Sequence, residues 1–133
     1  MIPAVNYRCK QNSELGASAM GRWTNLRKLS DRNYWYDDDF DYEGPACYEL
    51  AVAGPRGGRP QIVYVGETGN ERARLSFYAR HGSHLSAIID WHLARGWSLY
   101  YRGYALNSKE EARRMQDNRL SRFFYPWNTV GAS

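Results

Sequence analysis

The sequence predicts a small α+β domain in which helices flank a three-stranded antiparallel sheet. Two short apolar runs, residues 47–53 and 61–66, are joined by a glycine-rich and proline-rich connection, as neighbouring strands are. Three later segments place apolar residues at helical spacing, and a third apolar run precedes the last of them. The predicted order of elements is strand, strand, helix, helix, strand, helix, which is typical of an α+β domain.

The first two strands are expected to pair with each other. Residues 47–53 read CYELAVA and residues 61–66 read QIVYVG, and the loop 54–60 between them is too long for a two-residue hairpin turn. Strands connected in this way are most simply antiparallel. The first helix is then expected over residues 71–81, with its polar and basic side chains following the end of the second strand.

The remaining elements carry their own boundary signals. Ser83 is suited to cap a second helix, and Gly96 is suited to end it. Residues 97–106 return to a strand pattern. Ser108 stands three residues before Glu111, the spacing of a capping box, and predicts a last helix that runs to about Phe124.

Residues 1–44 show little periodicity and are expected to form an N-terminal extension that packs on the domain or contacts a partner such as DNA. Leu26 and Leu29 predict a short helix at most. The run 34–43 alternates acids with aromatic residues; a solvated loop is favoured there over a metal site or a mimic of nucleic acid. Residues 45–133 are expected to form the domain that carries the function.

Length and composition exclude several classes of protein. A chain of 133 residues is one domain by size. Its two cysteines, Cys9 and Cys47, form no CxxC pair, so neither a disulfide framework nor a structural zinc site is indicated. No apolar run approaches the roughly 20 residues of a membrane span. The expectation is a protein without a membrane partner, in a reduced, cytoplasmic setting.

The charge is concentrated in the second part of the chain. Residues 45–133 carry twelve Lys and Arg side chains against seven Asp and Glu, and eleven of the twelve are arginine. The arginine side chain is a planar fork that matches phosphate, and eleven tyrosines and five tryptophans accompany it. This composition favours a nucleic-acid partner, although a solvated arginine-rich surface explains the charge equally well.

Two tripeptides, Ala46-Cys47-Tyr48 and Tyr64-Val65-Gly66, lie in the predicted pair of strands. They resemble the first and second strand tripeptides of the GIY-YIG nuclease family. Arg74 follows eight residues after the second tripeptide, where the family has an arginine. Pro126-Trp127-Asn128 is similar to the terminal segment of phage and restriction members. The resemblance covers about residues 46–128.

The resemblance implies a metal-dependent DNA endonuclease that hydrolyses phosphodiester bonds. Tyr48 would act as general base or position the attacking water, and Arg74 would clamp the phosphate and stabilise a phenolate. The catalytic residues that it implies are Tyr48, Tyr64, Arg74, Tyr78 and Asn128. The residues expected to contact nucleic acid are Gly66, Arg72, Arg80, His81 and His84. One such site cuts one strand, so double-strand cleavage would require a homo-oligomer or two successive nicks.

The family glutamate that holds a single Mg²⁺ or Mn²⁺ ion falls on Gln116 in this chain. An amide can coordinate a hard cation through its oxygen, but it supplies no charge to hold one. Three explanations stay open: the protein has lost catalysis, Asp117 or Glu111 substitutes, or a glutamate has been exchanged for glutamine. Glu67 is a second-choice carboxylate near the site.

Two functions therefore compete. The first is a metal-dependent DNA endonuclease, present here in a form that Gln116 would disable. The alternative is a non-cleaving nucleic-acid-binding module derived from a nuclease fold, which keeps Arg74 and the aromatic surface.

Overall fold

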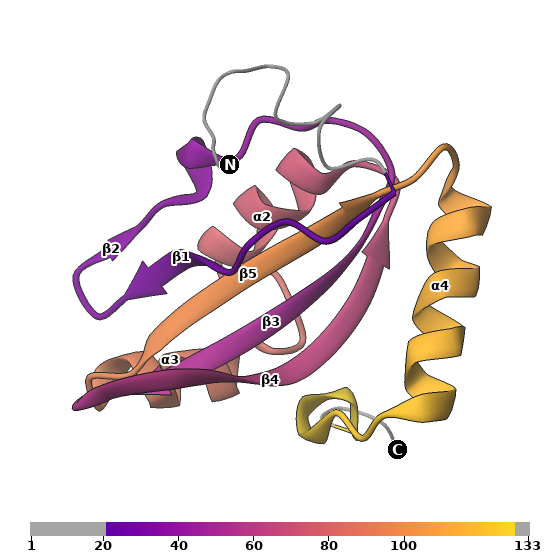
Figure 1. Cartoon of the computed structure of the whole chain (residues 1–133). Helices are drawn as coiled ribbons and strands as arrows, with labels where there is room; N and C mark the ends of the chain where they lie inside the picture. The colour runs from indigo at the N-terminus through magenta and orange to yellow at the C-terminus, as the bar shows by residue number, and fades with distance from the viewer. Residues whose placement is uncertain (1–20, 130–133) are drawn as a thin grey trace.

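The computed structural model describes residues 21–129, which form one sheet with helices on both of its faces (Figure 1). In chain order the elements are β1 (Arg27–Asp31), β2 (Tyr34–Trp35), η1 (Asp37–Asp39), β3 (Ala46–Gly54), β4 (Gly57–Thr68), α2 (Glu71–Ala79), α3 (Ser86–Ala94), β5 (Ser98–Ala105), α4 (Lys109–Arg122) and η2 (Pro126–Thr129). The two η elements are short 3-10 helices.

The predicted class is confirmed, but the sheet is larger than predicted. Its strand order is β2-β1-β5-β3-β4, and every neighbouring pair is antiparallel. The elements from β3 to α4 follow the predicted order. The prediction of three strands is wrong because β1 and β2 add two more beyond β5.

The segment that adds these strands was expected to contain a short helix at most. Leu26 and Leu29 are three residues apart, a helical spacing, but residues 27–31 pair with β5 instead. Leu29 is fully buried on the core face, and the Ser30 hydroxyl is also buried and donates to the Tyr34 carbonyl oxygen. A five-residue strand with one inward apolar side chain gives too short a pattern for alternation to be recognised. The division of the chain at residue 44 stays a prediction.

The connection between β3 and β4 is much shorter than predicted. Gly54 pairs with Gly57, so Pro55 and Arg56 alone form the turn, and the expected loop 54–60 is mostly strand. Gly57 and Gly58 have φ of +83° and +97°, a region that glycine enters without a steric penalty. The glycines and proline of residues 57–60 are typical of a loop, and for this reason a loop was predicted. They are tolerated in β4 because it is an edge strand of the sheet.

The helix boundaries follow the predicted signals with small shifts. Ser108 caps α4 as predicted, by accepting a hydrogen bond from the Glu111 amide. The cap of α2 was not predicted: it is Asn70, which accepts a hydrogen bond from the Ala73 amide. The Ser83 hydroxyl accepts a bond from the Leu85 amide, but α3 begins only at Ser86. Gly96, with φ of +87°, follows the end of α3 as expected.

The two faces of the sheet are covered by different helices. The larger core packs α2 and α3 against the alternate β3 residues Tyr48, Leu50 and Val52. A smaller core under α4 contains Cys47, which is buried as a free thiol, together with Val65 and Tyr125; Cys9 lies outside the described residues. Figure 1 shows α2 and α3 behind the sheet and α4 beside β4.

No helix within residues 21–129 is long and apolar enough to cross a membrane.

Candidate functional site

Tyr48 lies on the central part of the sheet, on the face that α2 covers. Its strand runs between β5 and β4, and Tyr48 pairs with Gly103 on one side and Gly66 on the other. A Cβ added at Gly66 would lie 2.5 Å from Tyr48 Cζ, inside the contact distance of two carbon atoms. The glycine of Tyr64-Val65-Gly66 therefore provides the space that the ring of Tyr48 occupies.

Three phenols from three elements come together on this face. The hydroxyls of Tyr48 on β3 and Tyr78 on α2 are 2.9 Å apart and share a hydrogen bond. The ring of Tyr64 on β4 lies 6.2 Å from that of Tyr48, measured between centroids. Tyr48 and Tyr78 are buried, whereas Tyr64 is half-buried and joins the pair to the surface. The structure thus brings together three of the predicted catalytic side chains.

An irregularity in β4 places Tyr64 in this group. Leu50 of β3 pairs with Tyr64, but the next residue, Ala51, pairs with Ile62, so β4 carries one extra residue at Val63. Such a β-bulge bends a strand and changes the direction of a side chain, and bulges are frequent beside functional sites. Val63 and Tyr64 consequently both contact the larger core.

Burial dominates the electrostatics of the phenols. It raises the pKa of Tyr48 well above the ordinary value of 10.0 and also raises the pKa of Tyr64 and Tyr78. The positive charge of Arg74 lowers these pKa values, but this effect is smaller than that of burial. All three phenols are therefore neutral hydrogen-bond donors near pH 7, and the expected phenolate is not favoured in the free protein.

Arg74 is the cation of this group. It is half-buried on α2, and its charge acts on Tyr48, Tyr64 and Tyr78. Within residues 21–129 its guanidinium has neither a carboxylate partner nor a side-chain hydrogen bond, and its Cζ lies over the Phe77 ring, 5.9 Å from the centroid. An unpaired guanidinium next to phenol donors is suited to bind an oxyanion.

The other side chains expected to contact nucleic acid are distributed differently. Arg72 is exposed and pairs with Glu43 at 3.2 Å. His81 follows the end of α2 and its Nδ1 lies 3.3 Å from a carboxylate oxygen of Asp90. His84 is exposed, with its ring centroid 6.0 Å from that of Tyr64. Arg80 is exposed at the C-cap of α2. Only His84 among these four contacts a phenol of the site.

Asn128 lies on η2 and binds the backbone of β4. Its Oδ1 accepts a bond from the Val65 amide, and its Nδ2 donates to the Val65 carbonyl, each at 2.9 Å. Both ends of the side-chain amide are used in this way. The asparagine therefore attaches the terminal segment to the strand that carries Tyr64.

A family model described as GIY-YIG domain-containing protein matches residues 37–133, which include all of the side chains described above. The chain belongs to the GIY-YIG family. The resemblance seen in the two strand tripeptides is thereby confirmed, and the match begins before the first of them, at the acidic element η1.

Two plant relatives of this GIY-YIG protein carry names that refer to transcription. Protein EFFECTOR OF TRANSCRIPTION 3 from Arabidopsis thaliana is 30% identical over 96% of this chain and 57% of its own length. Protein EFFECTOR OF TRANSCRIPTION 2 from the same plant is 31% identical over 63% of this chain and 23% of its own length. The chain thus corresponds to about half or less of these relatives. No solved structure matches it.

The residue expected at the metal position of the GIY-YIG family is Gln116, which is half-buried on α4 and brings no charge. Glu111 accepts a hydrogen bond from the Asn107 amide, and Glu67 pairs with Lys109 at 2.7 Å, so both have structural partners. Asp117 is exposed. Across residues 21–129 no three His, Cys, Asp or Glu side chains are grouped as metal ligands, and the neutral amide of Gln116 does not fit an ion that the family is expected to hold through a glutamate.

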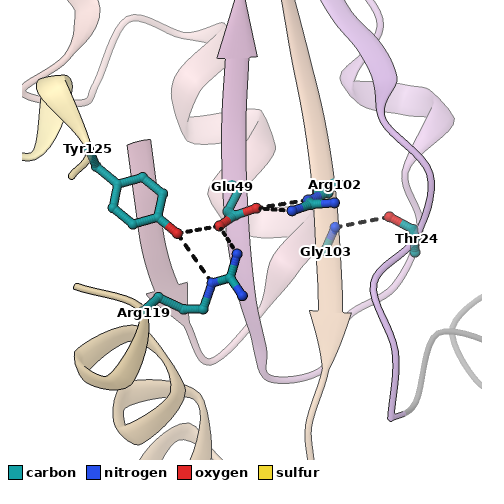
Figure 2. A network of polar contacts seen from close by, with 6 residues as sticks. All are labelled: Thr24, Glu49, Arg102, Gly103, Arg119 and Tyr125. Carbon is teal, nitrogen blue, oxygen red and sulfur yellow. Dashed lines mark hydrogen bonds and ion pairs between the residues drawn. The ribbon is translucent and has the colours of Figure 1, made fainter. Parts of the chain in front are cut away.

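A second polar network lies on the opposite face of the sheet of this GIY-YIG domain (Figure 2). Glu49 is fully buried on β3 and its carboxylate accepts bonds from Arg102 and Arg119, with N–O distances of 2.6 to 3.0 Å. The hydroxyl of Tyr125 donates to the same carboxylate at 2.5 Å. One buried acid therefore connects β3, β5, α4 and the terminal segment.

The residues of the second network were not selected from the sequence. The available signal was Glu49 itself, an acid inside the apolar run CYELAVA, because a buried carboxylate requires partners. Its partners come from distant elements, and the spacing along the chain does not identify them. Trp23 completes the group, with Arg102 and Arg119 4.7 and 5.2 Å from its ring centroid.

A second buried acid lies next to the phenols. Glu71, in the first turn of α2, accepts a hydrogen bond from Tyr101, whose ring stacks on that of Tyr48 at a centroid distance of 5.8 Å. Burial raises the pKa of Glu71 from 4.5 to about 7, against the opposing effects of Tyr101 and Arg27. In the sequence an acid at the start of a helix indicates an exposed capping residue, so this role was missed.

Proposed function

We propose that this chain is a nucleic-acid-binding module that holds a phosphodiester group at Arg74 without cutting it. The observation that supports it most directly is the guanidinium of Arg74, half-buried beside three phenols and without a carboxylate partner in the described part of the chain. Gln116, at the metal position of the family, supplies no charge for catalysis. The site keeps the groups that bind an anion and lacks the carboxylate that would hold a cation.

The chemistry of the phenols favours binding. Burial raises the pKa of both Tyr64 and Tyr78, so both keep their protons at neutral pH, and the half-buried Tyr64 is the more accessible donor of the two. An arginine fork and neutral hydroxyl donors are complementary to the non-bridging oxygens of a phosphodiester. A general base would require a phenolate, which the buried surroundings disfavour.

DNA is the polymer that we infer. The relatives are named for an effect on transcription, which takes place on a DNA template. The excess of arginine in residues 45–133 is consistent with contacts to a phosphate backbone.

The binding test is a titration of labelled DNA followed by fluorescence anisotropy at several salt concentrations. We expect Arg74→Ala to weaken binding by about 10- to 100-fold, because hydrogen bonds to charged groups contribute roughly 1.5–3 kcal/mol. Arg32→Ala is the matched control: this exposed arginine lies in the turn between β1 and β2, at the sheet edge opposite β4. Equal losses in both variants would show that only general charge is involved.

A second candidate is a metal-dependent nicking endonuclease. The convergence of Tyr48, Tyr64, Tyr78 and Arg74 on one face favours it, because the family resemblance implies catalytic roles for all four. The test is relaxation of supercoiled plasmid with Mg²⁺ or Mn²⁺, using this chain and its Gln116→Glu variant. Nicking by the variant alone supports a disabled site. Nicking by the unaltered chain that Tyr48→Phe abolishes would replace the binding module with the endonuclease.

A further inference from the structure

Phe77 is an aromatic side chain that the anion site leaves unused. It lies on α2 between Arg74 and Tyr78, yet its side chain points away from the core and is 39% exposed. Tyr78, the next residue, is buried among the phenols, so the same helix presents one ring to the core and another to solvent. Singly exposed aromatic side chains are common on protein surfaces, and this one is distinguished by its position, because the Arg74 guanidinium lies over its ring.

The end of α2 fixes the position of this ring. The Gly82 amide donates to the Phe77 carbonyl and the His81 amide to the Tyr78 carbonyl, which is the bond pattern of a Schellman motif. His81 occupies the left-handed position, with φ of 60°. A Cβ at Gly82 would collide with the Phe77 ring, so this ring lies directly against the glycine. Phe77 is held in place while part of its surface stays accessible.

The ring and the anion site are close enough to share one nucleotide. The centroid of Phe77 lies 5.9 Å from Cζ of Arg74. In a nucleic-acid strand the base is separated from its phosphate by a single sugar. A base attached to a phosphate at Arg74 would therefore be one sugar away from the exposed part of this ring.

We infer that Phe77 is a stacking subsite for an unpaired base next to the phosphate at Arg74, so that the site selects single-stranded nucleic acid over duplex. This inference rests on the proposed function. A base in a duplex is stacked and paired on both sides, whereas an unpaired base is free to lie on an aromatic ring. The other exposed aromatic side chains of the described chain, Tyr34, Trp91, Phe123 and Phe124, lie on or next to other elements.

The test compares a labelled single-stranded oligonucleotide, the corresponding duplex and an abasic strand of the same length. Phe77→Ala is expected to weaken single-strand binding about tenfold, which is the lower part of the range for one stacked base. It should leave duplex and abasic binding unchanged. Phe77→Trp keeps an aromatic surface and should bind the single strand as the unaltered chain does. Phe124→Ala, which removes the most exposed of these rings, is the matched control and should change none of the three.

The outcomes separate the two ideas. If Arg74→Ala weakens binding to all three DNAs but Phe77→Ala changes none, the stacking subsite is wrong and the phosphate site stands. Equal losses for single strand, duplex and abasic strand in Phe77→Ala would also overturn the subsite, because they indicate a damaged helix. If the unaltered chain binds none of the three, both the proposed function and this inference fail.

Discussion

The ring of Tyr48 and the backbone of Gly66 are packed against each other so closely that no side chain fits between them. Tyr48 is 1% exposed, and its ring packs against the rings of Tyr64, Tyr78 and Tyr101. The two strand tripeptides of the family thus meet in one contact. The tyrosine of the first fills the space that the glycine of the second leaves open.

Gly66→Ala is expected to destabilise the protein because its Cβ would overlap the Tyr48 ring. Overpacking of a core typically lowers the free energy of unfolding by about 1–3 kcal/mol, which chemical denaturation measures. Gly69→Ala is the control, since the nearest atom to its Cβ would be Lys109 Cδ at 3.6 Å, an ordinary contact. Equal stability of Gly66→Ala and the unaltered chain would contradict the close packing of Tyr48.

The elements that were predicted correctly are those whose local pattern matches their final environment. The strand 46–54 is buried along nearly its whole length, and its continuous apolar run allowed it to be predicted from the sequence. Ser108 caps the last helix in the way its spacing to Glu111 predicts. The strand 27–31 was missed because its identity depends on pairing with β5, some seventy residues later, and not on its own side chains.

The candidate site was partly predictable for the same reason. Tyr48, Tyr64 and Arg74 occupy positions fixed by motifs within strands and helices, so the resemblance located them. Glu71 and Glu49 could not be assigned roles from the sequence, because burial of an acid is decided by distant residues. The structure makes Glu49 the centre of a network from four separate segments.

We expect Asn128 to be a structural residue that needs both the acceptor oxygen and the donor nitrogen of its side-chain amide. Asn128→Ala leaves the amide and carbonyl of Val65 without partners and should cost about 1–3 kcal/mol of unfolding free energy. Asn128→Asp should also destabilise, because a carboxylate cannot donate to the Val65 carbonyl. Thr129→Ala, which removes an exposed hydroxyl bond to Pro126, is the control and should be nearly neutral. A neutral Asn128→Asp variant would contradict this role.

Among the substitutions considered for stability, loss of the Glu49 carboxylate is expected to lower the free energy of unfolding most. Glu49→Ala leaves Arg102 and Arg119 without their shared buried acid, and removal of one partner of a buried ion pair costs about 3–5 kcal/mol. Glu67→Ala is the matched control on the neighbouring strand. It removes a partner of the exposed Lys109, so a loss of about 1 kcal/mol or less is expected. Thermal unfolding of both variants measures the difference, and similar losses would contradict the assigned importance of Glu49.

Glu71 is expected to give the protein a pH-dependent stability between about pH 4.5 and pH 7. Its pKa is raised to about 7 in the folded protein, from an ordinary value of 4.5, because it is buried. Between these two values the folded state keeps the proton and the unfolded state has lost it. The free energy of unfolding should therefore fall as the pH rises through this range and level off above it.

Glu71→Gln tests this behaviour because the amide stays neutral at every pH and still accepts the hydrogen bond from Tyr101. The variant and the unaltered chain should be similarly stable near pH 4.5. By pH 7 to 8 the variant should be more stable, by at most about 3 kcal/mol for a pKa difference of this size. Glu110→Gln, in the exposed first turn of α4, is the control and should show no such divergence. Urea denaturation across this pH range measures the difference in free energy of unfolding between the variant and the unaltered chain. A difference that stays constant with pH would mean that Glu71 is already ionised in the folded protein.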